Sequence, residues 1–436
     1  MKKTFFSYSF GCRVNEAEKE EIDRKMALNG FKFTKSKPDI FIINSCAVTN
    51  KAEREVRQLV YQTKKRIPKT KIVITGCSAT YWLRNKLYQD LPVDLIVDNI
   101  NKEFLVDIIK KRLSSQPPLD RSGRERVVGT SKFLDSERLL IKIQDGCQRC
   151  CSYCIVPYLR GLPKSYLTKN IVDKINKQIN IKEVILTAVN TEAFGHDTGE
   201  NLTQLVSQII NKTSIPRISF GSIHPWSIDK KFLNFYRKIV KKNRLINFFH
   251  IPLQSGSDKT LTLMKRGYAS KDLLWKIKEI KKINSYAQIA TDVIVGFLDE
   301  SDNDFKETYR FLEKNPIDKF HVFRFSNRLL TAAFFMKKKF PVISNNLKIK
   351  RAKLLTNLSK KKYQQFLVQL QNINYRSQAL FIDRFKNGYQ QALLDNQVPA
   401  WIKINKRMTG EIKNVKINQL KDLNLFGVLS TSLLAP

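Results

Sequence analysis

The sequence has no apolar run that approaches the ~20 residues a membrane-spanning helix needs. Its first ten residues are apolar only in part and are interrupted by serines. A charged stretch at residues 16–21 follows, and no small-residue cleavage site separates the two. We therefore expect neither a membrane anchor nor export, and we predict a cytoplasmic protein.

Acidic side chains are scarce. There are 39 Asp and Glu against 78 Lys and Arg, which gives a formal net charge of +39. A compositional bias toward Lys, Asn and Ile, with solvated lysine faces, is one explanation. A polyanionic partner explains so large an excess better, and nucleic acid is the first candidate. A membrane surface is disfavoured because no basic amphipathic anchor stands out.

Histidine is rare as well, and its four positions lack the spacing of metal ligands. We interpret His196, His224, His250 and His321 as structural. Cysteine is odd in number, with four of seven residues crowded into one short stretch. Without an export signal, this pattern favours metal binding over disulfides. The cysteines are Cys12, Cys46, Cys77, Cys147, Cys150, Cys151 and Cys154.

Strand-like and helix-like segments alternate through the first 112 residues. Strands are predicted at 4–10, 40–44, 71–75 and 95–97, and helices at 15–29, 51–65 and 102–113. This alternation predicts a parallel sheet covered by helices. Cys12, Cys46 and Cys77 each follow a predicted strand, so we expect them at one edge of the sheet, where they can hold a cluster. Three buried cysteines that pack as small hydrophobes are the alternative.

Two further regions follow a predicted linker at residues 114–130, which contains Pro117-Pro118 and Gly123. Strands at 139–144, 183–188, 217–222, 247–252, 289–296 and 319–325, with helices between them, predict a full or partial βα barrel. A lysine-rich helix at 348–370 closes that region. Short strands at 378–382, 400–404 and 410–417, around the turn Asn387-Gly388, predict a small β-barrel. The predicted fold class is α/β, with domains at 1–115, 131–372 and 373–436.

The stretch 147–154 carries the chemistry. Cys147, Cys151 and Cys154 have the spacing C-x3-C-x2-C directly after a predicted barrel strand. Three cysteines leave one iron of a [4Fe-4S] cluster open, and in radical S-adenosylmethionine (SAM) enzymes that iron binds SAM, whose reductive cleavage yields a 5′-deoxyadenosyl radical. A structural zinc site is the alternative, but no second C-x2-C pair follows. We interpret Cys150 as a spare thiol.

The chain resembles the methylthiotransferase family of radical SAM enzymes over almost its whole length. The similar motifs are Gly11-Cys12-Arg13-Val14-Asn15, Asn44-Ser45-Cys46, Thr75-Gly76-Cys77, Gly146-Cys147 to Cys154-Ile155-Val156-Pro157, Arg160-Gly161, His250-Ile251-Pro252-Leu253-Gln254-Ser255-Gly256-Ser257-Asp258 and Thr291-Asp292-Val293-Ile294-Val295-Gly296-Phe297. Two stretches resemble the branch that modifies threonylcarbamoyl-adenosine in tRNA, namely Val48-Thr49-Asn50-Lys51-Ala52 and Gly256-Ser257-Asp258-Lys259-Thr260-Leu261.

The resemblance implies two [4Fe-4S] clusters. One, at Cys147, Cys151 and Cys154, generates the radical that abstracts hydrogen from C2 of an adenine beside the anticodon. The other, an auxiliary cluster held by three cysteines of the first domain, presents the sulfur, and a second SAM supplies the methyl group. These three cysteines are Cys12, Cys46 and Cys77.

The resemblance also implies partners. It makes the C-terminal barrel a TRAM-like RNA-binding module, whose phosphate-contact candidates are Lys403, Lys406, Arg407 and Lys413. It requires an electron donor and a sulfur source, which the sequence does not identify, and a monomer is favoured. The resemblance places Tyr153 near the SAM adenine. Further SAM candidates at predicted strand ends, each equally suited to a turn or a cap, are Asn190, Gln254, Ser255, Ser257, Thr291 and Asp292.

The sequence departs from the family at several loop positions. Leu298-Asp299 stands where Pro-Gly is usual, and Ser326-Asn327-Arg328-Leu329-Leu330-Thr331 stands where Ser-Pro-Arg-Pro-Gly-Thr is usual. Ala188 replaces a glycine, and His224 occupies a position often held by Glu. Losing glycine removes backbone conformations that loops can require. The cluster cysteines are unaffected.

Three alternatives stay open at this point. The first is the same reaction on isopentenyl-adenosine tRNA. The second is a non-catalytic, metal-stabilised RNA-binding protein, against which the six intact ligands argue. The third is a ribosomal-protein substrate, as in another branch of the family.

Overall fold

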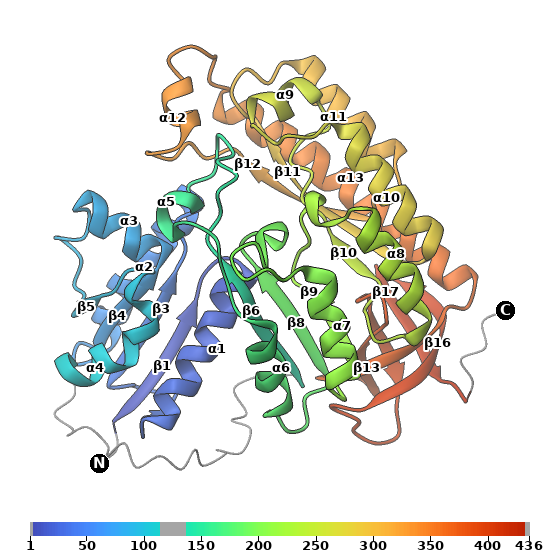
Figure 1. Cartoon of the computed structure of the whole chain (residues 1–436), viewed down its shortest axis with the longest axis horizontal. Coiled ribbons are helices and arrows are strands. Elements are labelled where there is room, and N and C mark those ends of the chain that lie inside the picture. The colour runs from blue at the N-terminus through green and yellow to red at the C-terminus, as the bar shows by residue number, and fades with distance from the viewer. Residues whose placement is uncertain (1–2, 114–136, 432–436) are drawn as a thin grey trace. The chain divides into compact units, whose positions relative to one another are not determined.

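The computed structural model describes residues 3–113 and 137–431 (Figure 1). The chain divides into two compact units. The first joins the N-terminal region to two later segments, 145–164 and 326–334, and the second holds 137–144, 165–325 and 335–431. The predicted linker lies outside the described residues, and the three domain boundaries stay a prediction. No helix among the described residues is long and apolar enough to cross a membrane.

The first unit contains the predicted parallel sheet. Its strands are ordered β2-β1-β3-β4-β5, and every neighbouring pair is parallel. The strands are β1 (Thr4–Ser9), β2 (Lys32–Phe33), β3 (Ile40–Ser45), β4 (Lys71–Gly76) and β5 (Leu95–Ile96). The helices are α1 (Arg13–Leu28), α2 (Asn50–Arg66), α3 (Cys77–Asn85) and α4 (Leu105–Leu113), with a 3-10 turn at Asn101–Phe104.

Both faces of this sheet are buried, which explains why β3 is apolar without alternation. Phe41 and Ile43 belong to one hydrophobic cluster, whereas Ile40 and Ile42 belong to another. Successive side chains of a strand point to opposite faces, so the two clusters lie on the two sides of the sheet. The α/β class predicted for this region is confirmed.

The second unit is built on parallel strands with helices around them (Figure 1). The strands are β6 (Arg138–Asp145), β8 (Glu183–Ala188), β9 (Arg217–Phe220), β10 (Phe248–His250), β11 (Gln288–Val295) and β12 (Lys319–Arg324), with short β7 (Lys164–Ser165) beside β6. An isolated bridge from Ile218 to Leu245 joins the β6–β9 sheet to the β10–β12 sheet. The larger helices are α6 (Thr168–Asn176), α7 (Leu202–Lys212), α8 (Lys230–Ile239), α10 (Ser270–Ile283), α11 (Asp302–Lys314) and α13 (Asn345–Asn372).

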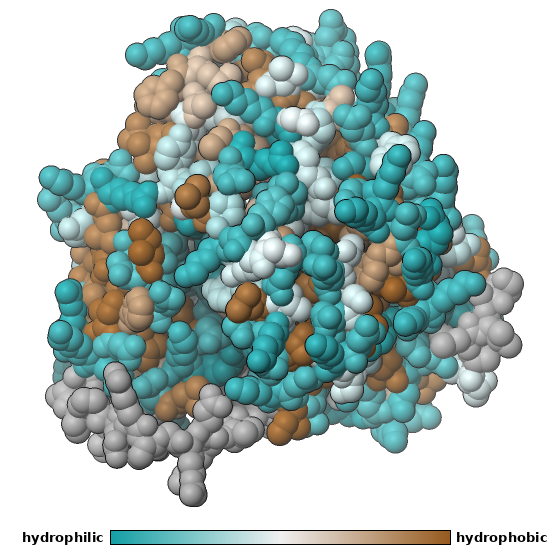
Figure 2. All heavy atoms as spheres, in the orientation of Figure 1, coloured by the Kyte–Doolittle hydropathy of each residue, from teal (hydrophilic) through white to brown (hydrophobic). Residues whose placement is uncertain are grey.

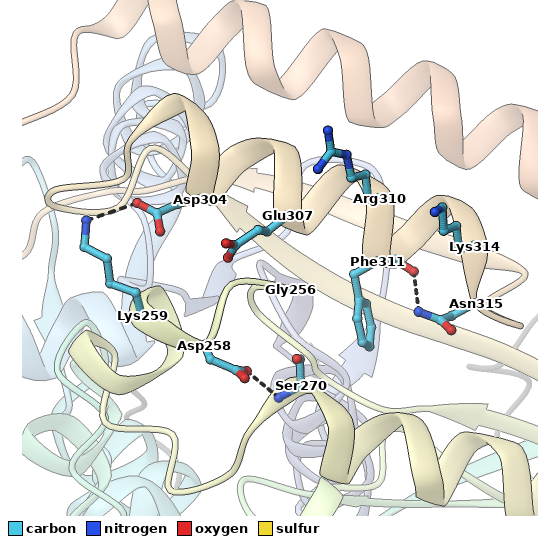
Figure 3. A pocket seen from close by; sticks show the side chains of 10 residues that line it. All are labelled: Gly256, Asp258, Lys259, Ser270, Asp304, Glu307, Arg310, Phe311, Lys314 and Asn315. Atoms are coloured by element: carbon cyan, nitrogen blue, oxygen red, sulfur yellow. Dashed lines mark hydrogen bonds and ion pairs between the residues drawn. The ribbon is translucent and has the colours of Figure 1, made fainter.

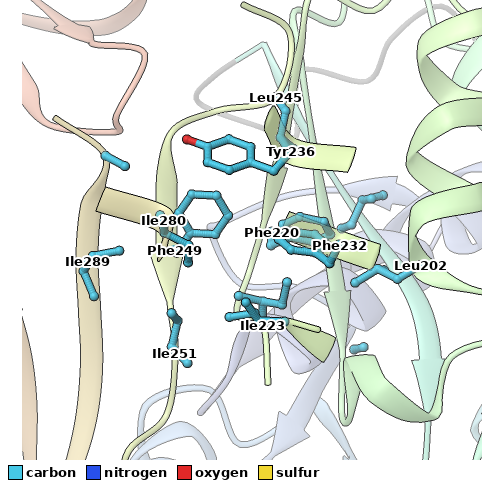
Figure 4. Packing of buried hydrophobic residues seen from close by; sticks show 14 of the residues in the cluster. Leu202, Phe220, Ile223, Phe232, Tyr236, Leu245, Phe249, Ile251, Ile280 and Ile289 are labelled. Atoms are coloured by element: carbon cyan, nitrogen blue, oxygen red, sulfur yellow. The ribbon is translucent and has the colours of Figure 1, made fainter. Parts of the chain in front are cut away.

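One large hydrophobic cluster holds the helices to these strands. Figure 4 shows its aromatic part, where Phe232 and Tyr236 of α8 meet Phe220 of β9 and Phe249 of β10. Phe249 packs edge-on against Tyr236 and Phe232, with ring centroids 5.0 and 6.3 Å apart. Such pairs add to the free energy of burial. The predicted βα barrel region is thus a partial barrel with a packed exterior.

The C-terminal residues form a closed barrel in the order β13-β14-β15-β17-β16. The strands are β13 (Arg376–Lys386), β14 (Tyr389–Leu393), β15 (Pro399–Lys403), β16 (Ile412–Lys421) and β17 (Asn424–Leu429). The predicted turn is confirmed, because Asn387 and Gly388 both have positive φ, at 47° and 78°, and link two antiparallel strands. Strands β14 and β17 had no clear signal in the sequence.

Buried charges connect this barrel to the strands of the partial barrel. The carboxylate of Glu183 in β8 accepts from Arg138 at 3.1 Å, from Arg217 at 3.4 Å and from Gln397 Nε2 at 2.6 Å. Arg217 also donates to the carbonyl of Leu394 at 2.9 Å. The turn at 394–397, between β14 and β15, is therefore held inside a buried polar network.

We expect Glu183→Gln to lower the free energy of unfolding by about 3 kcal/mol at neutral pH, because it removes the buried carboxylate that Arg138 and Arg217 share. Burial alone raises the pKa of Glu183, but Arg138 and Arg217 reverse this and lower it to about 2. The stabilisation is thus present above the ordinary pKa and lost as pH falls toward 2, so wild type and variant converge in acid. Urea titration at several pH values measures the difference.

The matched control is Glu55→Gln. Glu55 pairs with Lys51 at 3.7 Å on the surface, where both side chains are exposed. Exposed pairs contribute about 0–1 kcal/mol, so this variant should unfold like wild type. Equal effects of the two substitutions would show that the buried network does not stabilise the fold.

Candidate functional site

The three N-terminal cysteines lie on neighbouring loops at one edge of the first sheet. Strands β1, β3 and β4 are adjacent, and each ends shortly before one of these cysteines. Cys12 caps α1, Cys46 follows β3 directly, and Cys77 is the first residue of α3. Amide N–H groups at helix N-termini stabilise thiolates and other anions. The edge is thus suited to an anionic metal centre.

Two glycines let these loops approach closely. Gly11 has φ +96°, and a Cβ there would lie 2.7 Å from the Cβ and Sγ of Cys46. Gly76 has φ +95°, and a Cβ there would lie 2.4 Å from the carbonyl oxygen of Ser45. Any larger residue would force the loops apart. The glycines beside Cys12 and Cys77 are therefore required by the close packing of the cysteine loops.

The thiols are close enough to influence one another. Burial, together with the charges of Cys77 and Cys12, raises the pKa of Cys46 to about 12. Such a thiol ionises only when a metal replaces its proton. Yet no three His, Cys, Asp or Glu side chains in residues 3–113 and 137–431 are placed to hold a single metal ion. Three thiols on adjacent loops are the donor set of a [4Fe-4S] cluster with one open iron, and this second cluster stays a prediction.

The second cysteine motif forms a closed loop after β6, residues 146–162, which we call the radical-cluster loop. The amide of Cys147 donates to the carbonyl of Gly161 at 3.0 Å, and the amide of Cys154 donates to Cys151 at 2.9 Å. A Cβ on Gly146, φ +73°, would lie 2.1 Å from the carbonyl oxygen of Leu162. The short helix α5 (Val156–Arg160) completes the loop.

Exposure separates the four cysteines of this loop. Cys151 is buried, Cys147 and Cys154 are half-buried, and Cys150 is exposed with φ +48°. The three residues with C-x3-C-x2-C spacing are thus less exposed than Cys150. That these three hold a cluster, with Cys150 outside it, stays a prediction from the spacing.

Several residues that the sequence predicts near SAM form hydrogen bonds with other residues of the chain. The hydroxyl of Ser255 lies 3.1 Å from that of Thr308, Ser257 donates to Asp304 at 2.9 Å, and Thr291 donates to the carbonyl of Ile251 at 2.6 Å. Their SAM role stays a prediction, as does that of Tyr153.

Asn190 caps a 3-10 turn (Thr191–Ala193) by accepting from the Glu192 amide at 3.2 Å. Gln254 adopts φ +75° and its backbone bridges β11. Asp292 lies 2.9 Å from Nε2 of His250, on the adjacent strand. The pairing of His250, a residue interpreted as structural, was not visible in the sequence because it depends on strand register.

The loops that lack the family's glycines keep the left-handed conformation. Asp299 has φ +56° and Leu330 has φ +77°, and both stand where the family has Gly. Leucine in this region costs about 1–2 kcal/mol. Leu330 packs against the core of the first unit, and Asp299 forms an ion pair with Lys259 at 2.9 Å. Tertiary contacts therefore hold conformations that the side chains disfavour. Of the other departures, Ala188 is buried in the core.

A cavity among the described residues lies apart from the cluster cysteines. It has a volume of about 720 Å³ and lies among α9 (Asp258–Leu263), α10 and α11. Figure 3 shows charged side chains around it, with Lys259 paired to Asp304 and Asp258 accepting from the Ser270 amide. Of the predicted site stretch 254–258, only Gly256 and Asp258 line it. No cysteine lines this cavity.

Comparison with known proteins identifies the chain as a radical SAM enzyme. A family model described as "Radical SAM superfamily" matches residues 141–312, and another, "Uncharacterized protein family UPF0004", matches residues 4–98. This membership implies SAM and a [4Fe-4S] cluster.

Curated relatives narrow the class. The chain is 32% identical over 402 residues to "Threonylcarbamoyladenosine tRNA methylthiotransferase MtaB" of Aquifex aeolicus, covering 88% of this chain and 96% of the relative. It is 29% identical over 443 residues to "tRNA-2-methylthio-N(6)-dimethylallyladenosine synthase" of Natranaerobius thermophilus, covering 98% and 96%. The chain belongs to the radical SAM methylthiotransferase family.

Solved structures agree on the fold alone. The radical SAM methyltransferase TsrM from Kitasatospora setae has a TM-score of 0.51 at 10% identity and covers 74% of this chain and 73% of its own. The cobalamin-dependent radical SAM enzyme OxsB has a TM-score of 0.50 at 14% identity over 84% of this chain, which spans about half of OxsB (56%). The α/β fold class predicted from the sequence is confirmed.

Proposed function

We propose that this enzyme inserts a methylthio group at C2 of a threonylcarbamoyl-modified adenosine beside the anticodon of tRNA. The observation that carries the proposal is the presence of two separate three-cysteine sites, one at the sheet edge and one in the radical-cluster loop. A single radical cluster needs only the second. The additional site at the sheet edge would bind the cluster that presents the sulfur.

The two sites divide the work. When bound, a [4Fe-4S] cluster at Cys147, Cys151 and Cys154 supplies the electron that cleaves SAM. The three thiols of the radical-cluster loop would hold it. At the sheet edge, Cys12, Cys46 and Cys77 would hold the auxiliary cluster, with Cys46 and Cys77 buried and Cys12 exposed. Both sites lie in the first unit.

The choice of threonylcarbamoyl-adenosine rests on the relatives. Four relatives named for that modification are 27–33% identical to this chain, and three named for dimethylallyl-adenosine are 28–29% identical. The same reaction on isopentenyl-adenosine tRNA is therefore the second candidate. A non-catalytic RNA-binding role would not require two cysteine sites.

Charge supports an RNA substrate. Hydrophilic side chains cover most of the face shown in Figure 2, and the net charge is +39. On the C-terminal barrel, Lys403 and Lys406 are exposed, whereas Arg407 pairs with Asp383 at 2.7 Å and Lys413 with Glu411 at 3.0 Å. Lys403 and Lys406 are therefore the stronger phosphate contacts of the four. We place the enzyme in the cytoplasm with its tRNA.

Nucleoside mass analysis tests the substrate. Reconstituted enzyme, SAM and a reductant are incubated with tRNA that carries either threonylcarbamoyl-adenosine or isopentenyl-adenosine. We expect a methylthio product from the first tRNA, at least about tenfold faster than from the second. The reverse preference would establish the second candidate. SAM cleavage with neither product would contradict the proposed function.

A further inference from the structure

One buried arginine contacts the segments that carry both cysteine sites. Arg160, at the end of α5, is 2% exposed. Its Nη1 donates to Glu18 and to Asp145, each at 2.8 Å, and its Nη2 donates to Asn15 at 2.7 Å. Asn15 and Glu18 lie on α1, which Cys12 caps, and Asp145 ends β6 two residues before Cys147. The guanidinium thus bridges the starts of both cysteine segments.

Two asparagines extend this connection to the other N-terminal cysteines. Asn15 donates to the carbonyls of Phe10 at 2.7 Å and Ser45 at 3.0 Å, beside Cys12 and Cys46. Asn99 donates to the carbonyl of Leu159 at 3.1 Å and lies 3.8 Å from Sγ of Cys77. All three N-terminal cysteine loops are therefore tied to α5, the helix that follows Cys154.

Arg160 is also a permanent buried cation. Burial by itself lowers its pKa, but the charges of Glu18, Cys77 and Asp145 more than offset this and hold the pKa well above its usual value. Glu18 is shared with Lys102, which lies 2.6 Å away and is equally buried. A site with three thiolates is negatively charged, and nearby charge is one of the factors that set a cluster's reduction potential.

We propose that Arg160 is a positioning residue that fixes the radical-cluster loop against the auxiliary site, and that its charge raises the reduction potential of the auxiliary cluster. The inference rests on the proposed two-cluster function. A lysine at this position would keep the charge but lose the fork that reaches Asn15, Glu18 and Asp145 together.

The test compares Arg160→Gln and Arg160→Lys. Each is made in the wild type and in a Cys147/Cys151/Cys154→Ala background, where the auxiliary cluster is measured alone by EPR-monitored redox titration. We expect R160Q to lower its potential and R160K to stay near the unsubstituted value. In the wild-type background, we expect both variants to form about tenfold more 5′-deoxyadenosine per methylthio product, since misplaced groups lose coupling.

Glu18→Gln keeps a hydrogen-bond acceptor for Arg160 and removes a negative charge, so we expect it to raise the potential. If R160Q fails to retain iron, the direction in which E18Q shifts the reduction potential tests the proposed effect of charge. The control is Arg24→Gln, because Arg24 pairs with Glu21 at 2.7 Å on the surface of the same unit. We expect this control to match wild type.

Unchanged potential and unchanged coupling in iron-replete R160Q and E18Q would overturn the inference. That result differs from failure of the proposed function, in which the wild type itself would lack a second cluster or make no methylthio product.

Discussion

Replacing Cys147, Cys151 and Cys154 together by alanine should reduce iron from about eight to about four per chain after anaerobic reconstitution. Formation of 5′-deoxyadenosine should fall to background, because the variant lacks the cluster that binds and cleaves SAM. We expect the loop itself to keep its fold, because backbone hydrogen bonds such as that from the Cys147 amide to the carbonyl of Gly161 do not involve the cysteine side chains. Iron, acid-labile sulfide and 5′-deoxyadenosine are the quantities to measure.

Cys150→Ser is the matched control for this variant. Cys150 lies between the same ligands but is exposed. It should retain full iron and full SAM cleavage. Loss of a cluster in this variant would show that Cys150 is a ligand. Little iron and one tightly held zinc in the wild type would contradict the radical SAM interpretation and indicate a structural metal site.

Replacing Cys12, Cys46 and Cys77 by alanine should separate the two half-reactions. About four irons and SAM cleavage should persist, whereas methylthio product should fall to background because the sulfur has no place to bind. Alanine removes only one buried sulfur atom at each of two positions, so the sheet should still fold, which circular dichroism can check. Product analysis and 5′-deoxyadenosine are measured in the same reaction.

A variant that loses SAM cleavage together with product would contradict this division of work. It would indicate that the N-terminal cysteines support the radical site instead of supplying sulfur. Cys150→Ser again serves as control, since it changes one thiol without touching either three-cysteine site.

The sheet edge could be predicted from sequence because it depends on local pattern. Each of the apolar strands is followed closely by one cysteine, namely Cys12, Cys46 or Cys77. Placing these cysteines together required only the rule that parallel strands end at the same edge of a sheet. Adjacency of β1, β3 and β4 then brings the cysteines to one place. The same local logic found the turn at Asn387-Gly388.

The contacts of Arg160 could not be predicted in this way. Its motif was visible, but its partner Glu18 is 142 residues away in the chain. The clustering of residues 145–164 with the first unit was equally invisible. The sequence showed that Asp299 and Leu330 replace glycines, but it did not show that both residues would keep a positive φ. These features are set by tertiary contacts, which local patterns do not encode.

The buried turn at 394–397 has a consequence for how a large substrate is read. The backbone N–H of Asn247 donates to the carbonyl of Asp395 at 2.7 Å, and the side chain of Asn396 donates to the carbonyl of Tyr286 at 3.1 Å, in addition to the contacts of Glu183. These bonds attach the C-terminal barrel to the strands of the partial barrel at several points. If the barrel binds RNA as proposed, this attachment would hold that RNA at a set distance from the partial barrel, and we expect the length and shape of the tRNA to contribute to its selection.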